Sequence, residues 1–148
     1  MEAFAQGSGA FMHGHTYMGH PLACAAGVAA IRAYSDERLI ERSKRLGAEL
    51  FDELRRMQDR VDVIGDVRGG HGLFAVIELV RDRASRAEYP FELRAGHRAC
   101  LEARPLGAVL RPLGNVVVLM PPLAMSEDEL TRLGGIAVES IRRATARL

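Results

Sequence analysis

Residues 73–80 read Leu73-Phe74-Ala75-Val76-Ile77-Glu78-Leu79-Val80, and they carry the strongest strand signal in the chain. Aliphatic and aromatic residues favour strands, and only Glu78 interrupts the apolar run. We therefore expect a strand with one face in the protein core. A shorter β-like run, Val61 to Ile64, precedes it. Between the two runs, Arg68-Gly69-Gly70-His71-Gly72 predicts a glycine-rich turn.

The sequence after this strand predicts a loop, a helix and a second pair of strands. Residues 81–90 are charged and end in Tyr89-Pro90, which is typical of a surface loop. A helix is expected from Phe91 to Ala103. Two short strands are then expected at Val109 to Arg111 and Val116 to Met120. The four residues between them indicate a hairpin turn, Pro112-Leu113-Gly114-Asn115.

A final helix is indicated beyond the second of these strands. Pro121 and Pro122 end the strand, and Ser126 and Glu129 have the spacing of a capping box, in which each side chain bonds the other's exposed N–H group. The residues that follow predict an apolar stripe at helical spacing, formed by Leu130, Leu133, Ala137, Ile141 and Ala144.

Upstream of the strands, the sequence predicts an irregular arm and a long helix with a break. Residues 1–20 contain glycine, histidine and aromatic residues without periodicity. Pro21 suits a first helical turn, because its missing N–H group is not needed there. Ser35 and Asp36 are able to cap a new helical turn, so they indicate a break. Beyond them an apolar stripe recurs, formed by Leu39, Leu46, Leu50, Leu54 and Met57.

The order of these elements predicts an α+β fold. We expect a small sheet of about three or four strands, mixed or mostly antiparallel, with helices packed on one side. The chain divides into an arm, residues 1–20, and a small domain with its connecting helix, residues 21–148.

The composition excludes several classes of protein. The net charge of +1 gives no field of one sign, so neither nucleic acid nor a membrane is an expected partner. The longest apolar stretch, Pro21 to Ile31, is too short to span a bilayer. Cys24 and Cys100 belong to no C-x-x-C pair, so we expect no disulfide scaffold and a cytoplasmic location.

The densest group of polar side chains is His13-Gly14-His15-Thr16-Tyr17-Met18-Gly19-His20-Pro21. Three histidines suggest a metal site, but their spacing matches no H-E-x-x-H motif and no nearby carboxylate or cysteine completes a ligand set. A second interpretation is an anion site, built from the Thr16 hydroxyl, exposed backbone N–H groups and a helix N-terminus. The third is an ordinary loop that leads into a helix.

Two arginines are further candidates for binding residues. Arg68 in the glycine-rich turn serves either an anion or the fold, and Gly69 to Gly72 is not a dinucleotide fingerprint because no helix follows it. Arg111 lies between Leu110 and Pro112, and an arginine in apolar surroundings often pairs with a carboxylate through two parallel hydrogen bonds. That carboxylate belongs either to a ligand or to the fold itself.

Three blocks of the sequence resemble the class III aminotransferases. The first runs from Gly9 to Ala26 and includes His15-Thr16-Tyr17. The second contains Gly65 to Gly69, Gly72 to Phe74 and Ile77 to Val80, with a glycine turn at 68–72 one residue longer than the family pattern. The third runs from Leu110 to Leu123. The blocks follow the family order across nearly the whole chain.

This resemblance implies a dimeric fold type I enzyme that moves an amino group from a small-molecule donor to a keto acceptor through pyridoxal 5'-phosphate. It implies that Thr16 reaches the cofactor phosphate of the partner subunit and that the backbone around His15 assists. Arg111 corresponds to the arginine that holds the substrate carboxylate in the diaminopelargonate-forming branch of biotin synthesis. Tyr17 is expected near the substrate. Residues 1–20 are expected to belong to the cofactor-proximal part of the large domain.

The resemblance leaves the substrate open. It also implies a Schiff-base lysine that has no counterpart in this chain. The third block is most similar to the biotin-synthesis branch, and the first is equally similar to ω-amino-acid:pyruvate aminotransferases. In the family, the lysine that holds the cofactor as a Schiff base lies upstream of the first block. Lys44, the only lysine here, lies on the polar face of a predicted helix. We therefore expect no catalytic residue and no activity in this chain alone. The alternative from another class is a non-enzymatic remnant or subunit-binding domain.

Overall fold

The structure is a computed structural model that describes residue 6 and residues 13–148. The other residues of the predicted arm, 1–5 and 7–12, lie outside the described residues. The chain divides into two compact units, Met1–Glu37 and Arg38–Leu148. No helix in the described part of the chain is both long and apolar enough to cross a membrane.

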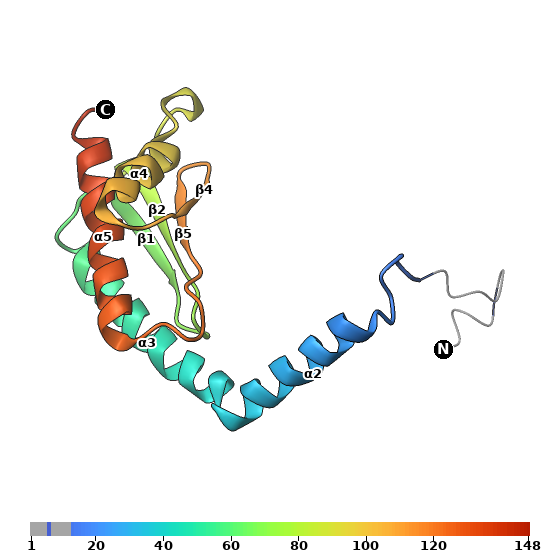
Figure 1. Cartoon of the computed structure of the whole chain (residues 1–148). Coiled ribbons are helices and arrows are strands. Elements are labelled where there is room, and N and C mark those ends of the chain that lie inside the picture. Colours follow the sequence, from blue (N-terminus) through green and yellow to red (C-terminus); the bar gives the residue numbers. More distant parts are fainter. Residues whose placement is uncertain (1–5, 7–12) are drawn as a thin grey trace. The chain divides into compact units, whose positions relative to one another are not determined.

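In the part of the first unit that the structure describes, the helix is α2 (Pro21–Asp36), drawn in Figure 1. Pro21 occupies the first helical turn, as predicted. His20 precedes it as the N-cap, and its Nδ1 atom accepts a hydrogen bond from the N–H group of Ala23 at 3.4 Å. None of the α2 side chains is buried.

The second unit begins with α3 (Leu39–Gln58), which follows a break in the helical backbone. Between the helices, Glu37 is the C-cap of α2 and Arg38 adopts a left-handed conformation with φ of 49°. The predicted break is therefore confirmed. The predicted cap is wrong, because Arg38 directly precedes α3 and makes no capping hydrogen bond with its side chain.

The second unit is built on a five-stranded sheet in which every strand pair is antiparallel. The strands follow the order β1-β2-β5-β4, and β3 pairs with β2 off this path. The sheet has one strand more than expected because a short hairpin forms after β2. The strand bounds are β1 (Ile64–Gly69), β2 (Ala75–Asp82), β3 (Ala87–Glu88), β4 (Arg111–Leu113) and β5 (Val116–Leu119).

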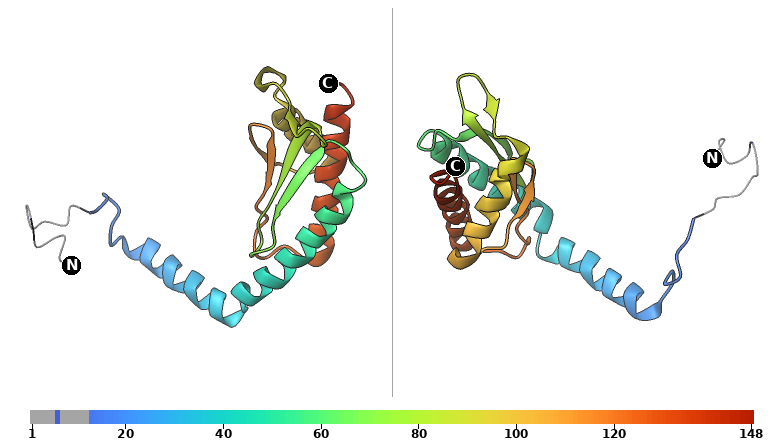
Figure 2. Two further views of the ribbon diagram at one scale, coloured as in Figure 1. Left: turned by 180° about the vertical axis from the view of Figure 1, so that it is seen from behind. Right: turned by 90° about the horizontal axis from the view of Figure 1, so that it is seen from above.

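Helices α3, α4 (Ala95–Ala103) and α5 (Glu127–Thr145) cover one face of this sheet and leave the other face open (Figures 1 and 2). The predicted α+β arrangement is therefore confirmed. At the start of α5 the predicted capping box is present, with Ser126 and Glu129 bonded to each other's backbone N–H groups. Between sheet and helices lies a core of fully buried side chains that includes Leu46, Leu54, Ile64, Val67, Ile77, Leu79, Val117, Leu119 and Ile141.

The bounds of β1 differ from the prediction. The strand begins at Ile64, where the predicted run ends, and it includes Arg68 and Gly69 from the predicted turn. The register explains this difference, since Val67 pairs with Ile77 of β2 and both side chains are buried against the helices. Burial of Val67 therefore extends the strand into the glycine-rich segment.

The bounds of the later strands are shifted as well. β2 continues to Asp82 and pairs with β3, so the predicted loop 81–90 is in part a hairpin. β4 contains Pro112 and Leu113, which confines the second turn to Gly114 and Asn115. Proline is tolerated in β4 because this strand lies at the edge of the sheet and has no second neighbour that needs its N–H group.

Candidate functional site

The first candidate group is a turn of the first unit that lies immediately before α2. The N–H group of Met18 donates to the carbonyl of His15 at 3.0 Å, and that of His20 donates to the carbonyl of Tyr17 at 3.1 Å. The side chains of His15, Thr16 and Tyr17 are all exposed. Three of the four residues predicted to bind cofactor or substrate therefore lie together on one turn.

This turn presents unused hydrogen-bond donors. The hydroxyl of Thr16 and the N–H groups of Thr16 and Tyr17 bond to no residue that the structure describes. Consecutive backbone N–H groups beside a hydroxyl are suited to a phosphate or carboxylate. The N-terminus of α2 contributes less than expected, because the His20 side chain already accepts from Ala23. The anion-binding capacity therefore belongs to the turn rather than to the helix N-terminus.

The histidines of this segment are not arranged around a common point. His20 uses Nδ1 to cap α2, and its ring contacts that of Tyr17 edge-on at a centroid separation of 6.5 Å. Within residues 13–148 and residue 6, no group of three or more His, Cys, Asp or Glu side chains is placed to share a metal ion. The geometry therefore gives the metal interpretation no support.

The second candidate group lies on the open face of the sheet in the second unit. The strand register places Arg68, Val76, Val118 and Arg111 opposite one another on four neighbouring strands. Side chains alternate along a strand, so this row points away from buried residues such as Val117 and toward the open face. Two arginines thus flank a pair of valines on one surface.

Arg111 is an exposed and unpaired charge at the end of this row. It forms no hydrogen bond or ion pair within the described part of the chain, so the structure contradicts a salt bridge within the fold. Arg111 lines a cavity of about 330 Å³ and is the only charged residue among the described ones that do so. The other walls are mainly apolar and include Val109, Leu110, Val118, Met120, Pro121, Pro122, Met125 and Leu133.

Arg68, at the other end of the row, has two carboxylate partners. Its Nη1 atom lies 2.9 Å from Asp66 Oδ2 and 2.5 Å from Glu78 Oε2. Hydrogen bonds to Glu78 and then to Asp66 raise the pKa of the Arg68 guanidinium. Because both partners belong to the sheet itself, the structural interpretation of Arg68 is favoured over an anion site.

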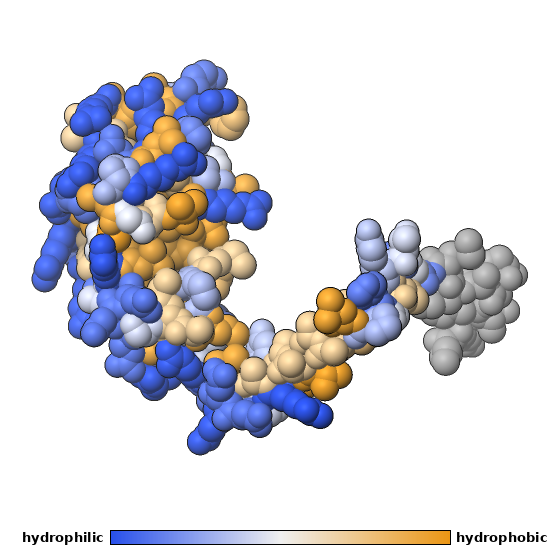
Figure 3. All heavy atoms as spheres, in the orientation of Figure 1, coloured by the Kyte–Doolittle hydropathy of each residue, from blue (hydrophilic) through white to orange (hydrophobic). Residues whose placement is uncertain are grey.

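The surface around Arg111 is apolar. Figure 3 shows hydrophobic residues gathered on the second unit where β2, β4 and β5 lie. Large apolar side chains are exposed in this region, with Val109 at 85%, Met120 at 69% and Leu113 at 66%. An exposed apolar patch beside a single unpaired cation is suited to a ligand that has a carboxylate and a hydrocarbon part.

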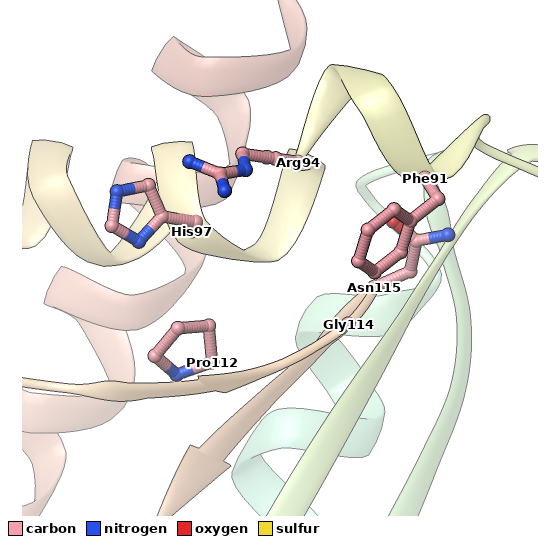
Figure 4. Close-up of a pocket in the computed structure, with 6 residues that line it drawn as sticks. All are labelled: Phe91, Arg94, His97, Pro112, Gly114 and Asn115. Atoms are coloured by element: carbon pink, nitrogen blue, oxygen red, sulfur yellow. The ribbon is translucent and has the colours of Figure 1, made fainter.

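A second cavity of about 290 Å³ lies between α4 and the turn that joins β4 to β5 (Figure 4). Pro112 forms one wall, and the opposite wall comes from His97 of α4 and from Arg94, which directly precedes that helix. Arg111 and Pro112 are consecutive residues of β4, so their side chains project to opposite faces of the sheet. None of the predicted site residues lines this second cavity.

Comparison with known proteins assigns the chain to a family. A family model described as aminotransferase class-III matches residues 1–141. The chain belongs to the class III aminotransferases. The aminotransferase resemblance of the three sequence blocks is thereby confirmed.

Several relatives share a more specific description. The adenosylmethionine-8-amino-7-oxononanoate aminotransferase of Geobacter sulfurreducens is 41% identical over 135 residues, which cover 91% of this chain and 29% of the relative. That of Nitratidesulfovibrio vulgaris is 46% identical over 123 residues, which cover 83% of this chain and 22% of the relative. The chain therefore spans less than a third of the length of these relatives.

Solved class III structures have the same fold. The adenosylmethionine-8-amino-7-oxononanoate aminotransferase of Methanocaldococcus jannaschii matches with a TM-score of 0.81 and 35% identity, covering 92% of this chain and 31% of that one. A PMP-bound aminotransferase of Vibrio fluvialis matches with a TM-score of 0.84 and 30% identity, covering 93% and 30%. The class III structures thus share both the arrangement and the order of these elements.

Proposed function

We propose that this chain provides the phosphate-contacting turn and the carboxylate-binding arginine of a pyridoxal-phosphate-dependent aminotransferase. The observation that carries the proposal is the unpaired guanidinium of Arg111 in an apolar cavity. The reaction moves an amino group from a small-molecule donor to a keto acceptor. The relatives of Geobacter sulfurreducens and Nitratidesulfovibrio vulgaris support 8-amino-7-oxononanoate as the acceptor, which is the diaminopelargonate-forming step of biotin synthesis.

The turn before α2 fits the phosphate end of the cofactor. Phosphate oxygens accept hydrogen bonds, and the Thr16 hydroxyl and the N–H groups of Thr16 and Tyr17 are free to donate them. His15 contributes through its carbonyl, which closes the turn with Met18. We assign this contact to the cofactor of the partner subunit in a homodimer. In the same assignment, residues 1–20 belong to the cofactor-proximal part of the large domain and residues 21–148 to the small domain with its connecting helix.

The residues of this chain do not fit the aldehyde end of the cofactor. When it is bound, pyridoxal phosphate supplies an electron sink, and the family holds it through a lysine amine. Lys44 is the only lysine and is exposed on α3 in the second unit. We therefore assign no catalytic residue to this chain. The 148-residue chain alone is expected to give no transamination above a blank that contains free pyridoxal phosphate.

Arg111 binds and orients the substrate in this proposal. Its planar guanidinium donates two parallel hydrogen bonds to a carboxylate, which fixes both position and direction. The apolar residues around it, among them Val118 and Met120, are suited to contact the hydrocarbon part of such a substrate. Tyr17, exposed on the turn of the first unit, is proposed to lie near the substrate.

The role of Arg111 is tested on the protein as its gene encodes it, with any residues that precede Met1. The acceptors 6-oxohexanoate and hexanal differ only in the terminal carboxylate. Arg111→Ala is expected to raise KM about tenfold or more for 6-oxohexanoate and to leave hexanal unchanged, because a charged hydrogen-bond partner is lost. Arg111→Lys keeps the charge but not the fork geometry, so its KM for 6-oxohexanoate should lie between those of the unchanged protein and Arg111→Ala. Equal effects on both acceptors would refute the assignment.

The ω-amino-acid:pyruvate activity is the second candidate. An (S)-enantioselective ω-transaminase of Thermomicrobium roseum matches this chain with a TM-score of 0.79 and 34% identity, covering 99% of this chain and 31% of that one. The two candidates differ in their acceptor, so kcat/KM is compared for 8-amino-7-oxononanoate and pyruvate. A higher kcat/KM for pyruvate would favour the ω-amino-acid:pyruvate activity. The role of Arg111 is decided separately, by the Arg111 variants.

The role of Thr16 is tested by cofactor binding rather than by turnover. Thr16→Val is expected to weaken the binding of pyridoxal phosphate about tenfold while leaving pyridoxal, which has no phosphate, unaffected. A fluorescence titration of the apoprotein measures the affinity for both compounds.

A cytoplasmic location is also proposed, and the two free thiols of Cys24 and Cys100 support it.

A further inference from the structure

The segment that joins β5 to α5, residues 120–126, accepts two hydrogen bonds from one side chain of α3. Arg42 donates from Nε to the carbonyl of Leu123 at 3.2 Å and from Nη2 to the carbonyl of Met125 at 2.5 Å. The Arg42 side chain is partly buried, and it reaches residues more than 80 positions away in the sequence. Hydrogen bonds from a charged donor are stronger than neutral ones. Arg42 thus acts as a two-point clamp on this segment.

The clamped segment is also a wall of the cavity that contains Arg111. Met120, Pro121, Pro122 and Met125 all line that cavity. Two prolines and a turn bond from Met125 N–H to the carbonyl of Pro122 shape the segment, but neither anchors it to α3. Besides the Arg42 clamp, the segment is held by the packing of Leu123 and Met125 against the core and, at its end, by the capping box of Ser126 with Glu129.

From these contacts we propose that Arg42 is a positioning residue for the carboxylate site of Arg111. It touches neither substrate nor cofactor. It fixes the residue 120–126 segment, and that segment forms the wall of the cavity in which the Arg111 guanidinium binds the substrate carboxylate. This inference rests on the proposed function, because it needs Arg111 to bind a substrate carboxylate.

The test uses the protein as its gene encodes it, loaded with pyridoxal phosphate, and the acceptors 6-oxohexanoate and hexanal. Arg42→Ala is expected to raise KM for 6-oxohexanoate about tenfold with kcat unchanged, because two charge-assisted hydrogen bonds are lost from the wall. KM for hexanal should change much less. Arg42→Lys keeps one charged donor and is expected to recover part of the loss. Hydrogen exchange should show faster exchange in residues 120–126 of Arg42→Ala.

Arg45→Ala is the matched control. Arg45 lies one turn further along α3 and pairs with Glu49 and Glu127, and it forms no hydrogen bond or ion pair with residues 120–126 in the described part of the chain. It should leave KM for both acceptors and exchange in residues 120–126 unchanged. Equal losses of kcat on both acceptors in Arg42→Ala, or the same KM effect in Arg45→Ala, would overturn the positioning role.

The same series separates the inference from the proposed function. If Arg111→Ala fails to discriminate between the acceptors, the proposed function falls and the positioning role falls with it. If Arg111→Ala discriminates but Arg42→Ala and Arg42→Lys do not, only the positioning role is wrong. Should Arg42→Ala not fold, the KM shift and exchange of Arg42→Lys decide the question by the same comparison.

Discussion

Arg68 and Arg111 show how neighbouring residues decide what an arginine is available to do. Both lie on one row across the open face of the sheet, yet Arg68 is paired with Asp66 and Glu78 while Arg111 has no partner among the described residues. The register accounts for the difference, because β2 places Glu78 opposite Asp66, whereas β5 places valines beside β4. Of these two arginines, only Arg111 therefore has a guanidinium that is available to bind the carboxylate of a ligand.

The two cysteines are predicted to differ in reactivity. Burial raises the pKa of the Cys100 thiol from its ordinary 9.0 to about 11, and Cys24 is exposed. At pH 8, iodoacetamide should therefore alkylate Cys24 and leave Cys100 unmodified in the folded chain, as read by mass spectrometry. Because the folded state holds the Cys100 proton more tightly, the stability from this thiol is complete below pH 9.0 and is lost as the pH rises through about 11. Rapid alkylation of Cys100 at pH 8 would contradict this assignment.

At the scale of elements, α4 and the β4–β5 turn are predicted to depend on the absence of one side chain. A Cβ atom on Gly96 would lie 2.4 Å from the carbonyl oxygen of Gly114, which belongs to the backbone and is not free to rotate away. Gly96→Ala should therefore lower the unfolding free energy by about 1–3 kcal/mol. Urea unfolding followed by circular dichroism measures this change.

Gly135→Ala in α5 is the control for this prediction. A Cβ atom there meets no other atom within 4 Å, so the change should be neutral or should stabilise α5 by up to about 1 kcal/mol through helix propensity. If both variants lost stability equally, the close approach of α4 to the β4–β5 turn would not be the cause.

The elements with strong local signals were predictable. The proline of α2, the capping box of α5 and the apolar strand β2 all depend on residues close in sequence, and all were found. The bounds of β1 and β4 were not, because they follow from pairing with β2 and β5. Val67 extends β1 only because Ile77 lies opposite it, and no local pattern specifies such a register.

The candidate site also combines residues that have a local sequence signal with residues that have none. The sequence predicts Thr16 and Arg111 as site residues because each lies in a short motif that resembles the family, and both stay predictions. Arg42 was missed, since its partners, the carbonyls of Leu123 and Met125, are backbone groups that every residue type carries. The apolar neighbours of Arg111 had a weak signal, because alternation along the predicted strand Val116 to Met120 places Val118 and Met120 on one face.

At the scale of the whole molecule, the hydrophobic core lies entirely in the second unit as far as the chain is described. Its buried cluster runs from Leu46 to Ala144, while α2 in the first unit has no buried side chain. The first unit instead carries the predicted phosphate contacts. In the proposed function, the core that stabilises the fold and the contact with the cofactor phosphate therefore belong to separate parts of the chain.

This separation predicts that residues 38–148 fold without the first unit. A chain that starts at Arg38 retains α3, the whole sheet and the buried cluster, so its urea unfolding midpoint should match that of the 148-residue chain. A chain that starts at Phe51 is the control, since it removes Leu46 and Leu50 from the core and should not fold cooperatively. A large loss of stability in the chain that starts at Arg38 would mean that α2 stabilises the second unit. In that case the first unit would serve the fold as well as the cofactor, and the effects of Thr16 variants on cofactor binding would have to be corrected for the fraction of unfolded protein.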